Sequence, residues 1–219
     1  MILQTIPVGR LQANCYVVGD DDTREVLVID PGDQAAALVQ HLRGESVVVR
    51  YVFVTHAHLD HSGGAHDLLE AFPDARFVMH ALDHPSIALQ APSAASWYGH
   101  AVTPPRAPDV PAEHGGTLAV GRHRFTLLHT PGHTPGSVCL AGEGGVFTGD
   151  VLFQGSIGRH DFPGSSGPDL LRSIKHHLLT LPPETHVYPG HGPATTIEDE
   201  RRYNPFLVNP SATLGFDVD

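Results

Sequence analysis

The stretch THAHLDH, residues 55–61, decides how this sequence is interpreted. It follows the apolar, β-branched run VVVRYVFV (47–54), which is typical of a β-strand. It precedes SGGAHDLLEAF (62–72), whose apolar residues have helical spacing. A segment at the carboxyl end of a strand and the start of a helix is a usual place for chemistry, so we expect a functional site here.

The spacing of this segment favours metal binding. In an extended or tightly turned chain, His56 and His58 point to the same side. Both imidazoles can then reach one metal ion at ~2.0–2.1 Å. Asp60 and His61 follow where the chain turns into the helix, and they can reach a second ion. Two ions ~3.5–4 Å apart would explain why one short segment carries four potential ligands.

Three further polar residues follow predicted strands later in the chain. His133 lies in LLHTPGHTPGS, Asp150 in GVFTGD and His191 in VYPGHG. Each comes directly after a strand, or in a glycine-rich turn that follows one. We expect all three at strand ends, on the same edge of the fold as residues 55–61.

The composition narrows the class of protein. The 219 residues carry a formal net charge of −11, and Lys175 is the only lysine. A nucleic-acid-binding protein usually has clustered Lys and Arg, so we expect no nucleic-acid partner. Cys15 and Cys139 lie in apolar runs and are predicted to be buried strand cysteines without a disulfide. The 17 histidines are more than one site needs, so most are expected to be surface or packing residues.

The amino-terminal segment and the hydropathy pattern indicate the location. Residues 1–19 lack a basic start followed by a continuous apolar stretch, and they resemble a strand, a turn and a strand. No apolar run is long enough to span a membrane. We therefore expect a cytoplasmic protein with no membrane partner.

Strands and helices alternate in both halves of the chain. Residues 91–116 are rich in Pro, Ala, Gly and Ser and are predicted to form a loop or a loose crossover. The strands after this loop are short, with tight turns, and are expected to be antiparallel. The pattern predicts two sheets packed face to face with helices outside. Helices are expected at 34–44, 62–72, 168–182 and 197–204.

The motifs together resemble a known family. HAHLDH, PGHT, TGD and PGHG, after an early VIDPG, are similar to the metallo-β-lactamase superfamily over nearly the whole chain. GDVLFQGSIGRHDFPG, LLRSIKHHLLTLP, VYPGHGPATTI and ERRYNPF resemble its short glyoxalase II-like (hydroxyacylglutathione hydrolase-like) branch. The resemblance implies an α/β fold, an αββα sandwich of two mixed β-sheets flanked by helices. It also implies a single domain over 1–219, without a separate C-terminal substrate-binding domain.

The resemblance also implies roles for the candidate ligands. A first metal ion takes His56, His58 and His133, a second takes Asp60, His61 and His191, and Asp150 bridges the two. A metal-bound hydroxide attacks a carbonyl, with Asp60 and Asp150 as the catalytic carboxylates. The ions are expected to be zinc, with iron or manganese as alternatives, because the ligands are imidazoles and carboxylates.

Residues around the ligands are candidates for supporting roles. Asp30, in VIDPG, can accept a proton from a ligand imidazole and fix its tautomer. Thr55 and Thr148 are either supports of this kind or ordinary strand-end residues. Phe153, Ile157 and Arg159 are candidates for the substrate pocket. Arg159 either binds a substrate carboxylate or pairs with Asp161 and braces the loop.

The expected substrate is a small-molecule thioester such as S-lactoylglutathione. Two alternatives stay open from the sequence. One is a persulfide dioxygenase with a single iron on the first site, which resembles the same branch. The other is a metal-binding module that keeps the fold without turnover, although the complete ligand set favours an enzyme.

Overall fold

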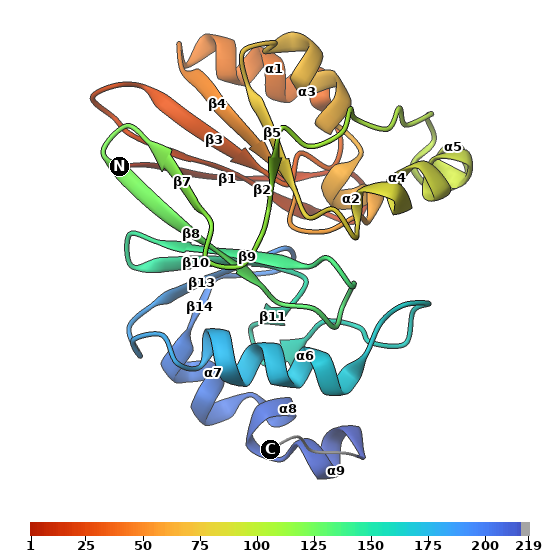
Figure 1. Ribbon diagram of the computed structural model, residues 1–219, viewed down its shortest axis with the longest axis vertical. Coiled ribbons are helices and arrows are strands. Elements are labelled where there is room, and N and C mark those ends of the chain that lie inside the picture. Colours follow the sequence, from red (N-terminus) through yellow and green to blue (C-terminus); the bar gives the residue numbers. More distant parts are fainter. Residues whose placement is uncertain (216–219) are drawn as a thin grey trace. The chain divides into compact units, whose positions relative to one another are not determined.

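The computed structural model describes residues 1–215, which form two mixed β-sheets accompanied by helices (Figure 1). The chain divides into two compact units. Unit 1 consists of Met1–Ala112 and Leu118–Arg124, and unit 2 consists of Glu113–Thr117 and the chain from Phe125 onward. The expected α/β class with two mixed sheets flanked by helices is confirmed.

The first sheet has the strand order β1-β2-β3-β4-β5-β6. The first three strands pair antiparallel and the last four pair parallel, which makes the sheet mixed. Every residue of the apolar strand β2 is buried, and its Ala13, Cys15 and Val17 belong to the core of unit 1. The strands are β1 (Ile2–Val8), β2 (Ala13–Gly19), β3 (Glu25–Ile29), β4 (Val48–Phe53), β5 (Arg76–Met79) and β6 (Val110–Pro111).

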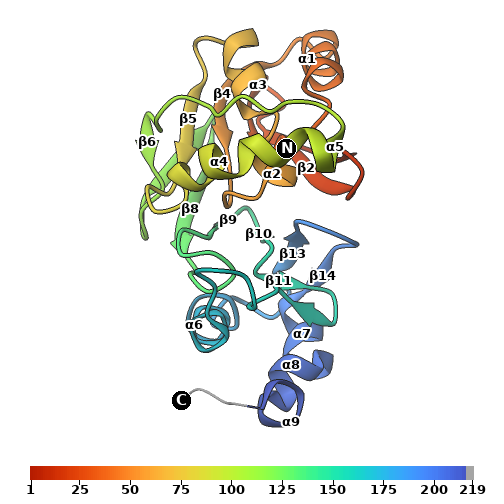
Figure 2. The ribbon, with the colours of Figure 1, turned by 90° about the vertical axis from the view of Figure 1, so that its right-hand side faces the viewer.

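The helices of unit 1 begin after parallel strands. Helices α1 and α3 lie side by side against the sheet in Figure 1, and they bury their leucines against it. In Figure 2, α4 and α5 follow one another beside α2. The helices are α1 (Ala35–Gly44), α2 (Leu59–Ser62), α3 (Ala65–Ala71), α4 (His84–Gln90), the 3-10 turn η1 (Ala91–Ser93) and α5 (Ala94–Tyr98).

One expectation about this unit was wrong in part. Residues 91–116 were predicted to form a loop or a loose crossover. They belong to the connection between the parallel strands β5 and β6, as a crossover would, but they also contain η1, α5 and β6 itself. Pro, Ser and Gly lower the helical propensity of this segment, and tertiary contacts override that weak preference. The helix expected at 62–72 is present as α2 followed by α3, with Gly63 and Gly64 between them.

The second sheet has the strand order β14-β13-β10-β9-β8-β7. Strands β8, β9 and β10 pair antiparallel, as expected, whereas β10 and β13 pair parallel. A small hairpin of β11 (Leu152–Phe153) and β12 (Ser156–Ile157) follows β10. The sheet strands are β7 (Thr117–Val120), β8 (His123–His129), β9 (Val138–Gly142), β10 (Gly145–Gly149), β13 (His186–Pro189) and β14 (Thr195–Thr196).

The helices of unit 2 pack their apolar faces on this sheet. The helix predicted at 168–182 is present as α6 (Gly167–Ser173), continued by the π-helical turn η2 (Ile174–Leu178). Ser166 caps its start by accepting a hydrogen bond from the Asp169 amide. The chain then forms α7 (Ile197–Tyr203), α8 (Pro205–Val208) and α9 (Pro210–Leu214). Within residues 1–215, none of the helices is both long and apolar enough to cross a membrane.

Candidate metal centre

Asp30 is hydrogen-bonded to the candidate ligand segment of unit 1, residues 55–61. This buried carboxylate accepts three hydrogen bonds, from the Thr55 amide at 2.7 Å, from the Thr55 hydroxyl at 2.7 Å and from His61 Nδ1 at 2.9 Å. Asp30 and Thr55 each follow a parallel strand, β3 and β4, which are hydrogen-bonded neighbours. Asp30 is therefore bound to the ligand segment, as the sequence predicted for it.

The hydrogen bond between Thr55 and His56 fixes which ring nitrogen carries the proton. Thr55 Oγ1 lies 3.0 Å from His56 Nδ1 and donates its own hydrogen to Asp30. A hydroxyl has only one hydrogen, so Oγ1 can only accept from His56. Nδ1 of His56 must then be protonated, and Nε2 keeps the lone pair that a metal ion needs.

The other ring nitrogens of His56 and His61 face further candidate ligands. His56 Nε2 lies 3.1 Å from His58 Nδ1. Two ligand nitrogens at ~2.0–2.1 Å from one tetrahedral ion would be about 3.3–3.4 Å apart, so this spacing fits a shared ion. His61, bound to Asp30 through Nδ1, turns Nε2 toward Asp60 Oδ2 at 3.6 Å. Unit 1 thus offers two pairs of candidate ligand atoms within residues 56–61. One pair comes from His56 and His58, and the other comes from Asp60 and His61.

The peptide between the first two histidines is held from both sides. The Ala57 amide donates to Asp83 Oδ2 at 2.9 Å, and the Ala57 carbonyl accepts from Gln90 Nε2 at 3.1 Å. Both partners belong to the α4 region, with Asp83 at the N-cap and Gln90 in the last turn. The sequence interpretation missed them, because residues 26 and 33 positions away carry no local signal of this contact.

A close backbone approach explains the glycine of VIDPG. A Cβ built on Gly32 would lie 1.5 Å from the carbonyl oxygen of Asp60, so only glycine fits. Asp30 itself has a φ of 51°, in the left-handed region that non-glycine residues rarely adopt. Its three hydrogen bonds stabilise this strained conformation.

Two other titratable groups lie near the unit 1 ligands. Burial raises the pKa of Tyr98 to about 12, and the charge of Asp60 adds to the rise. Burial, and then the charge of Asp30, raises the pKa of the Cys15 thiol. A nucleophilic cysteine needs a lowered pKa, so Cys15 is a protonated core residue, as predicted, and not a nucleophile.

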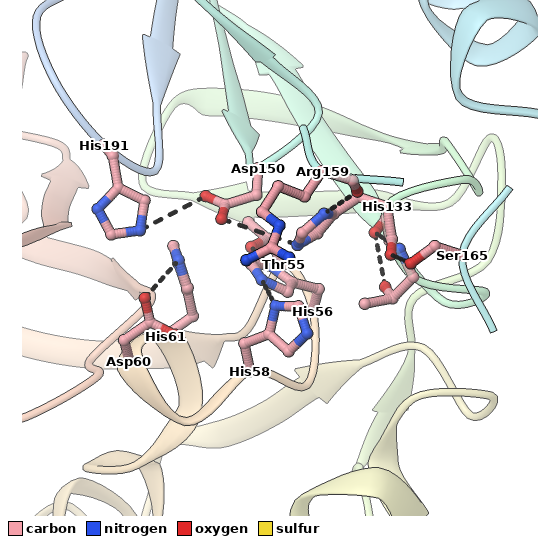
Figure 3. A network of polar contacts seen from close by, with 12 residues as sticks. Thr55, His56, His58, Asp60, His61, His133, Asp150, Arg159, Ser165 and His191 are labelled. Atoms are coloured by element: carbon pink, nitrogen blue, oxygen red, sulfur yellow. Dashed lines mark hydrogen bonds and ion pairs between the residues drawn. The ribbon is translucent and has the colours of Figure 1, made fainter. Parts of the chain in front are cut away.

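In unit 2, a backbone carbonyl orients His133. His133 Nδ1 lies 2.8 Å from the carbonyl oxygen of Arg159, and its main-chain carbonyl accepts from Ser165 Oγ at 2.7 Å (Figure 3). A carbonyl can only accept, so Nδ1 is protonated and Nε2 keeps its lone pair. The partner of His133 Nδ1 is a main-chain carbonyl, which every residue has, so the sequence could not predict it.

Asp150 lies between the two histidines of this unit. Its Oδ2 is 3.7 Å from His133 Nε2, and its Oδ1 is 3.8 Å from His191 Nε2 (Figure 3). Each carboxylate oxygen therefore faces a different imidazole. Gaps of this size are longer than hydrogen bonds. A carboxylate with one oxygen toward each of two imidazoles is suited to bridging two ions.

The predicted pocket residues have three different environments. Arg159 forms two hydrogen bonds of 2.9 Å with Asp161, and its guanidinium lies 4.0 Å from the centre of the Phe162 ring. This favours the bracing role over binding a substrate carboxylate. Ile157 is buried in the core of unit 2, and its place in a substrate pocket stays a prediction. Phe153 is partly exposed, with its ring 6.4 Å from that of His191.

The structure thus gathers the seven predicted ligands into two groups. Unit 1 carries one group and unit 2 the other. In both groups the ring nitrogens left by the Nδ1 hydrogen bonds face other candidate ligands. Unit 1 carries His56, His58, Asp60 and His61, and unit 2 carries His133, Asp150 and His191.

Comparison with known proteins gives a family and several relatives. A model described as the metallo-β-lactamase superfamily matches residues 8–191. A protein of Aquifex aeolicus is 42% identical over 94% of this chain and 97% of its own length. Haemophilus influenzae has a relative named hydroxyacylglutathione hydrolase GloC, 37% identical over 96% of this chain and 100% of its own. The Bacillus subtilis probable metallo-hydrolase YqgX is 36% identical, with 92% and 95% covered.

Solved structures agree on the fold. TTHA1623 in a di-iron-bound form is 40% identical, with a TM-score of 0.83 and coverage of 93% of this chain and 100% of that one. The B3 metallo-β-lactamase BLEG-1 has a TM-score of 0.84 at 37% identity, with 95% and 100% covered. ETHE1 from Myxococcus xanthus has a TM-score of 0.77 at 32% identity, with 94% and 84% covered.

Proposed function

The chain belongs to the metallo-β-lactamase superfamily, and from this premise we propose that it is a metal-dependent hydrolase of thioesters. The proposed centre would hold two divalent metal ions. His56, His58 and His133 would bind the first, Asp60, His61 and His191 would bind the second, and Asp150 would contribute to both. A structural relative that was solved with two iron ions supports the number of ions.

The observation that carries this proposal is the hydrogen bonding of the ligand imidazoles. His56, His61 and His133 are all buried, and each is bound through Nδ1 to a group that fixes the ring. Packing histidines need no such common arrangement. Partners of this kind are typical of metal-ligating histidines, because they set the tautomer and raise the basicity of the other nitrogen. When bound, two metal ions lower the pKa of water and polarise the substrate carbonyl.

The side chains of the protein then have separate tasks. The Asp150 carboxylate offers one oxygen to each half of the centre and offsets positive charge. Asp60 is partly exposed, and we assign to the carboxylate oxygen that does not face His61 the proton that water releases as its oxygen bonds to the acyl carbon. The same proton passes to the sulfur as the carbon–sulfur bond breaks, so that the products are a carboxylic acid and a thiol.

The choice of a thioester rests on sequence likeness. The relative named hydroxyacylglutathione hydrolase is matched over its whole length at 37% identity. The partly exposed ring of Phe153, beside His191, supplies an apolar surface for an acyl or thiol group. S-lactoylglutathione is the first substrate to test, and zinc the first metal, with iron and manganese next.

The test measures metal content and thiol release on the same purified protein. We expect about two equivalents of metal and release of free thiol from S-lactoylglutathione or another acyl-thioester. The matched variant Asp150→Ala should lose metal and activity together. A metal-loaded sample that frees no thiol from a panel of acyl-thioesters would overturn the thioester assignment.

The same batch separates the two alternatives. A mononuclear-iron persulfide dioxygenase would contain one equivalent of iron and consume oxygen with glutathione persulfide. A non-catalytic metal-binding module would bind metal and show neither activity. Because metal content and both activities are measured together, each of the three functions has a different outcome.

A further inference from the structure

Glu200, on helix α7, is a buried carboxylate outside the ligand set. Only 2% of its surface is exposed, and its partners are three hydrogen-bond donors from three different segments. Oε2 accepts from the Gly155 amide at 2.9 Å and from Asn204 Nδ2 at 2.8 Å. Oε1 accepts from the Thr195 hydroxyl at 2.7 Å. Burying a carboxylate is costly unless it is well hydrogen-bonded, so this arrangement needs a reason.

The first donor belongs to the hairpin that follows Asp150. Gly155 lies at the turn between β11 and β12, and Asn204 Nδ2 holds the same turn by donating to the Ser156 carbonyl at 3.0 Å. The other end of the hairpin lies beside the backbone of Asp150. The Gly158 amide donates to the Val151 carbonyl, and a Cβ on Gly158 would lie 1.9 Å from the Asp150 carbonyl oxygen. Moving the turn therefore moves the backbone of Asp150.

The donor to Oε1, Thr195, belongs to the strand pair β13–β14, whose connecting turn carries His191. Thr195, in β14, pairs with Val187 of β13, and His191 lies in the turn between these two strands. The ends of β10 and β13 are joined directly by the hydrogen bond from the Gly190 amide to the Gly149 carbonyl, 2.8 Å. Glu200 supplies a second connection between the two ligand loops.

We propose that Glu200 is a positioning residue that sets the spacing between Asp150 and His191 by tying the β11–β12 turn to β14. The proposal rests on the proposed function, since it concerns the ion that His191 binds. Asp150 Oδ1 and His191 Nε2 are 3.8 Å apart, so a small shift of either loop changes whether one ion reaches both. Partners outside the ligand set typically change metal affinity by about 10–100-fold.

The experiment compares Glu200→Ala with Glu198→Ala. Glu198 lies on the same helix but is about half exposed, and it pairs with Arg202, so it controls for lost charge and for helix composition. Metal-free proteins are titrated with Zn²⁺ against a competing chelator, and His191→Ala identifies the ion that depends on His191. We expect Glu200→Ala to lower the affinity for the His191-dependent ion at least tenfold and the affinity for the other ion less than threefold. Glu198→Ala should change neither affinity.

Two further variants keep the test decisive if Glu200→Ala folds poorly. In Glu200→Gln the amide oxygen can serve Gly155 and Asn204, and the Thr195 hydroxyl can reverse and accept from the amide nitrogen. This variant should bind both ions within threefold of the wild type. Thr195→Val removes one connection and should weaken the His191-dependent ion by a smaller factor in the same direction.

Two results would overturn the proposal. One is a Glu200→Ala variant with a lowered melting temperature whose affinities for the two ions either fall equally or do not fall at all. That result shows a purely structural role. The other is Glu200→Gln behaving like Glu200→Ala. A wild type that holds fewer than two ions contradicts the proposed function instead. Metal-free protein then still tests Glu200, because Glu200→Ala should accelerate hydrogen exchange of the Gly155 amide and shift the His191 ring NMR signals.

Discussion

At the scale of single residues, the hydroxyl of Thr55 has the most specific task. It links the Asp30 carboxylate to Nδ1 of His56 with distances of 2.7 and 3.0 Å. Thr55→Val keeps the shape of the side chain and removes this link, so His56 loses the partner that fixes its tautomer. We predict that its affinity for the first ion falls about 10–100-fold. Zinc titration of the metal-free protein measures this.

Thr55→Ser is the matched control, because it retains the hydroxyl and removes only a methyl group. It should bind zinc within a few-fold of the wild type. Equal losses of affinity in the valine and serine variants would show that packing of the methyl group, and not the hydrogen bond, supports His56.

The residue scale also shows what a sequence can and cannot predict about a site. The seven candidate ligands and Asp30 could be proposed from the sequence, because imidazoles and carboxylates after strands are chemically conspicuous. Asp83, Gln90 and the carbonyl of Arg159 were not. The first two act across long separations in sequence, and the third acts through a main-chain atom that every residue has.

At the scale of elements, the segment after α5 is fastened to the loop that carries Asp30. His100 Nε2 lies 2.9 Å from Asp33 Oδ1, and its Nδ1 lies 3.1 Å from the Ala101 carbonyl. The Ala101 carbonyl raises the pKa of His100 most, and Asp33 and Asp67 add to the rise against a partial loss of solvation. The histidine therefore binds its proton more tightly in the folded state than in the unfolded state.

The sign of the pH dependence follows from this raised pKa. The stabilisation is fully present below the unfolded pKa, about 6.5 for histidine, and it is lost as the pH rises through the higher folded value. We predict that His100→Ala lowers the free energy of unfolding at pH 5.5 and has a smaller effect at pH 9. Urea unfolding at both pH values measures the difference.

A double-mutant cycle isolates the ion pair. In an Asp33→Asn background, the cost of His100→Ala should depend less on pH, because the neutral amide does not favour the protonated ring, while the Ala101 carbonyl and Asp67 still do. A cost that is the same at pH 5.5 and pH 9 in the wild-type background would contradict the proposed charge interaction.

The helices and strands differ in how well their local sequences predict them. Strands β2 and β3 were predictable from their short apolar runs, which are buried along almost their whole length. Helix α1 was predictable from its helical spacing of apolar residues, which matches the face that it buries. Helices α4 and α5 were not, because their short, Pro- and Ser-containing sequences depend on contacts such as Gln90 with Ala57 and His100 with Asp33. Ile157 could not be distinguished as a core residue, because a two-residue strand has no readable period.

At the scale of the whole molecule, each unit has its own buried core. Cluster residues such as Val28 and Phe77 belong to unit 1, and Cys139 and Leu170 belong to unit 2. The proposed metal ions take four ligands from one unit and three from the other. Metal binding should therefore stabilise the folded chain and make the two units unfold together, since an ion that binds only the folded state shifts the equilibrium by mass action.

We predict that removing metal with a chelator lowers the free energy of unfolding and separates the two units in unfolding. One ion at a thousand times its dissociation constant contributes about 4 kcal/mol. Hydrogen exchange of the buried Leu27 and Leu140 amides reports on units 1 and 2 separately. In loaded protein both should exchange with one free energy, and in metal-free protein with two. Asp150→Ala should behave as metal-free protein even in excess zinc. Unchanged exchange on metal removal would mean that the ligands of the two units do not share ions.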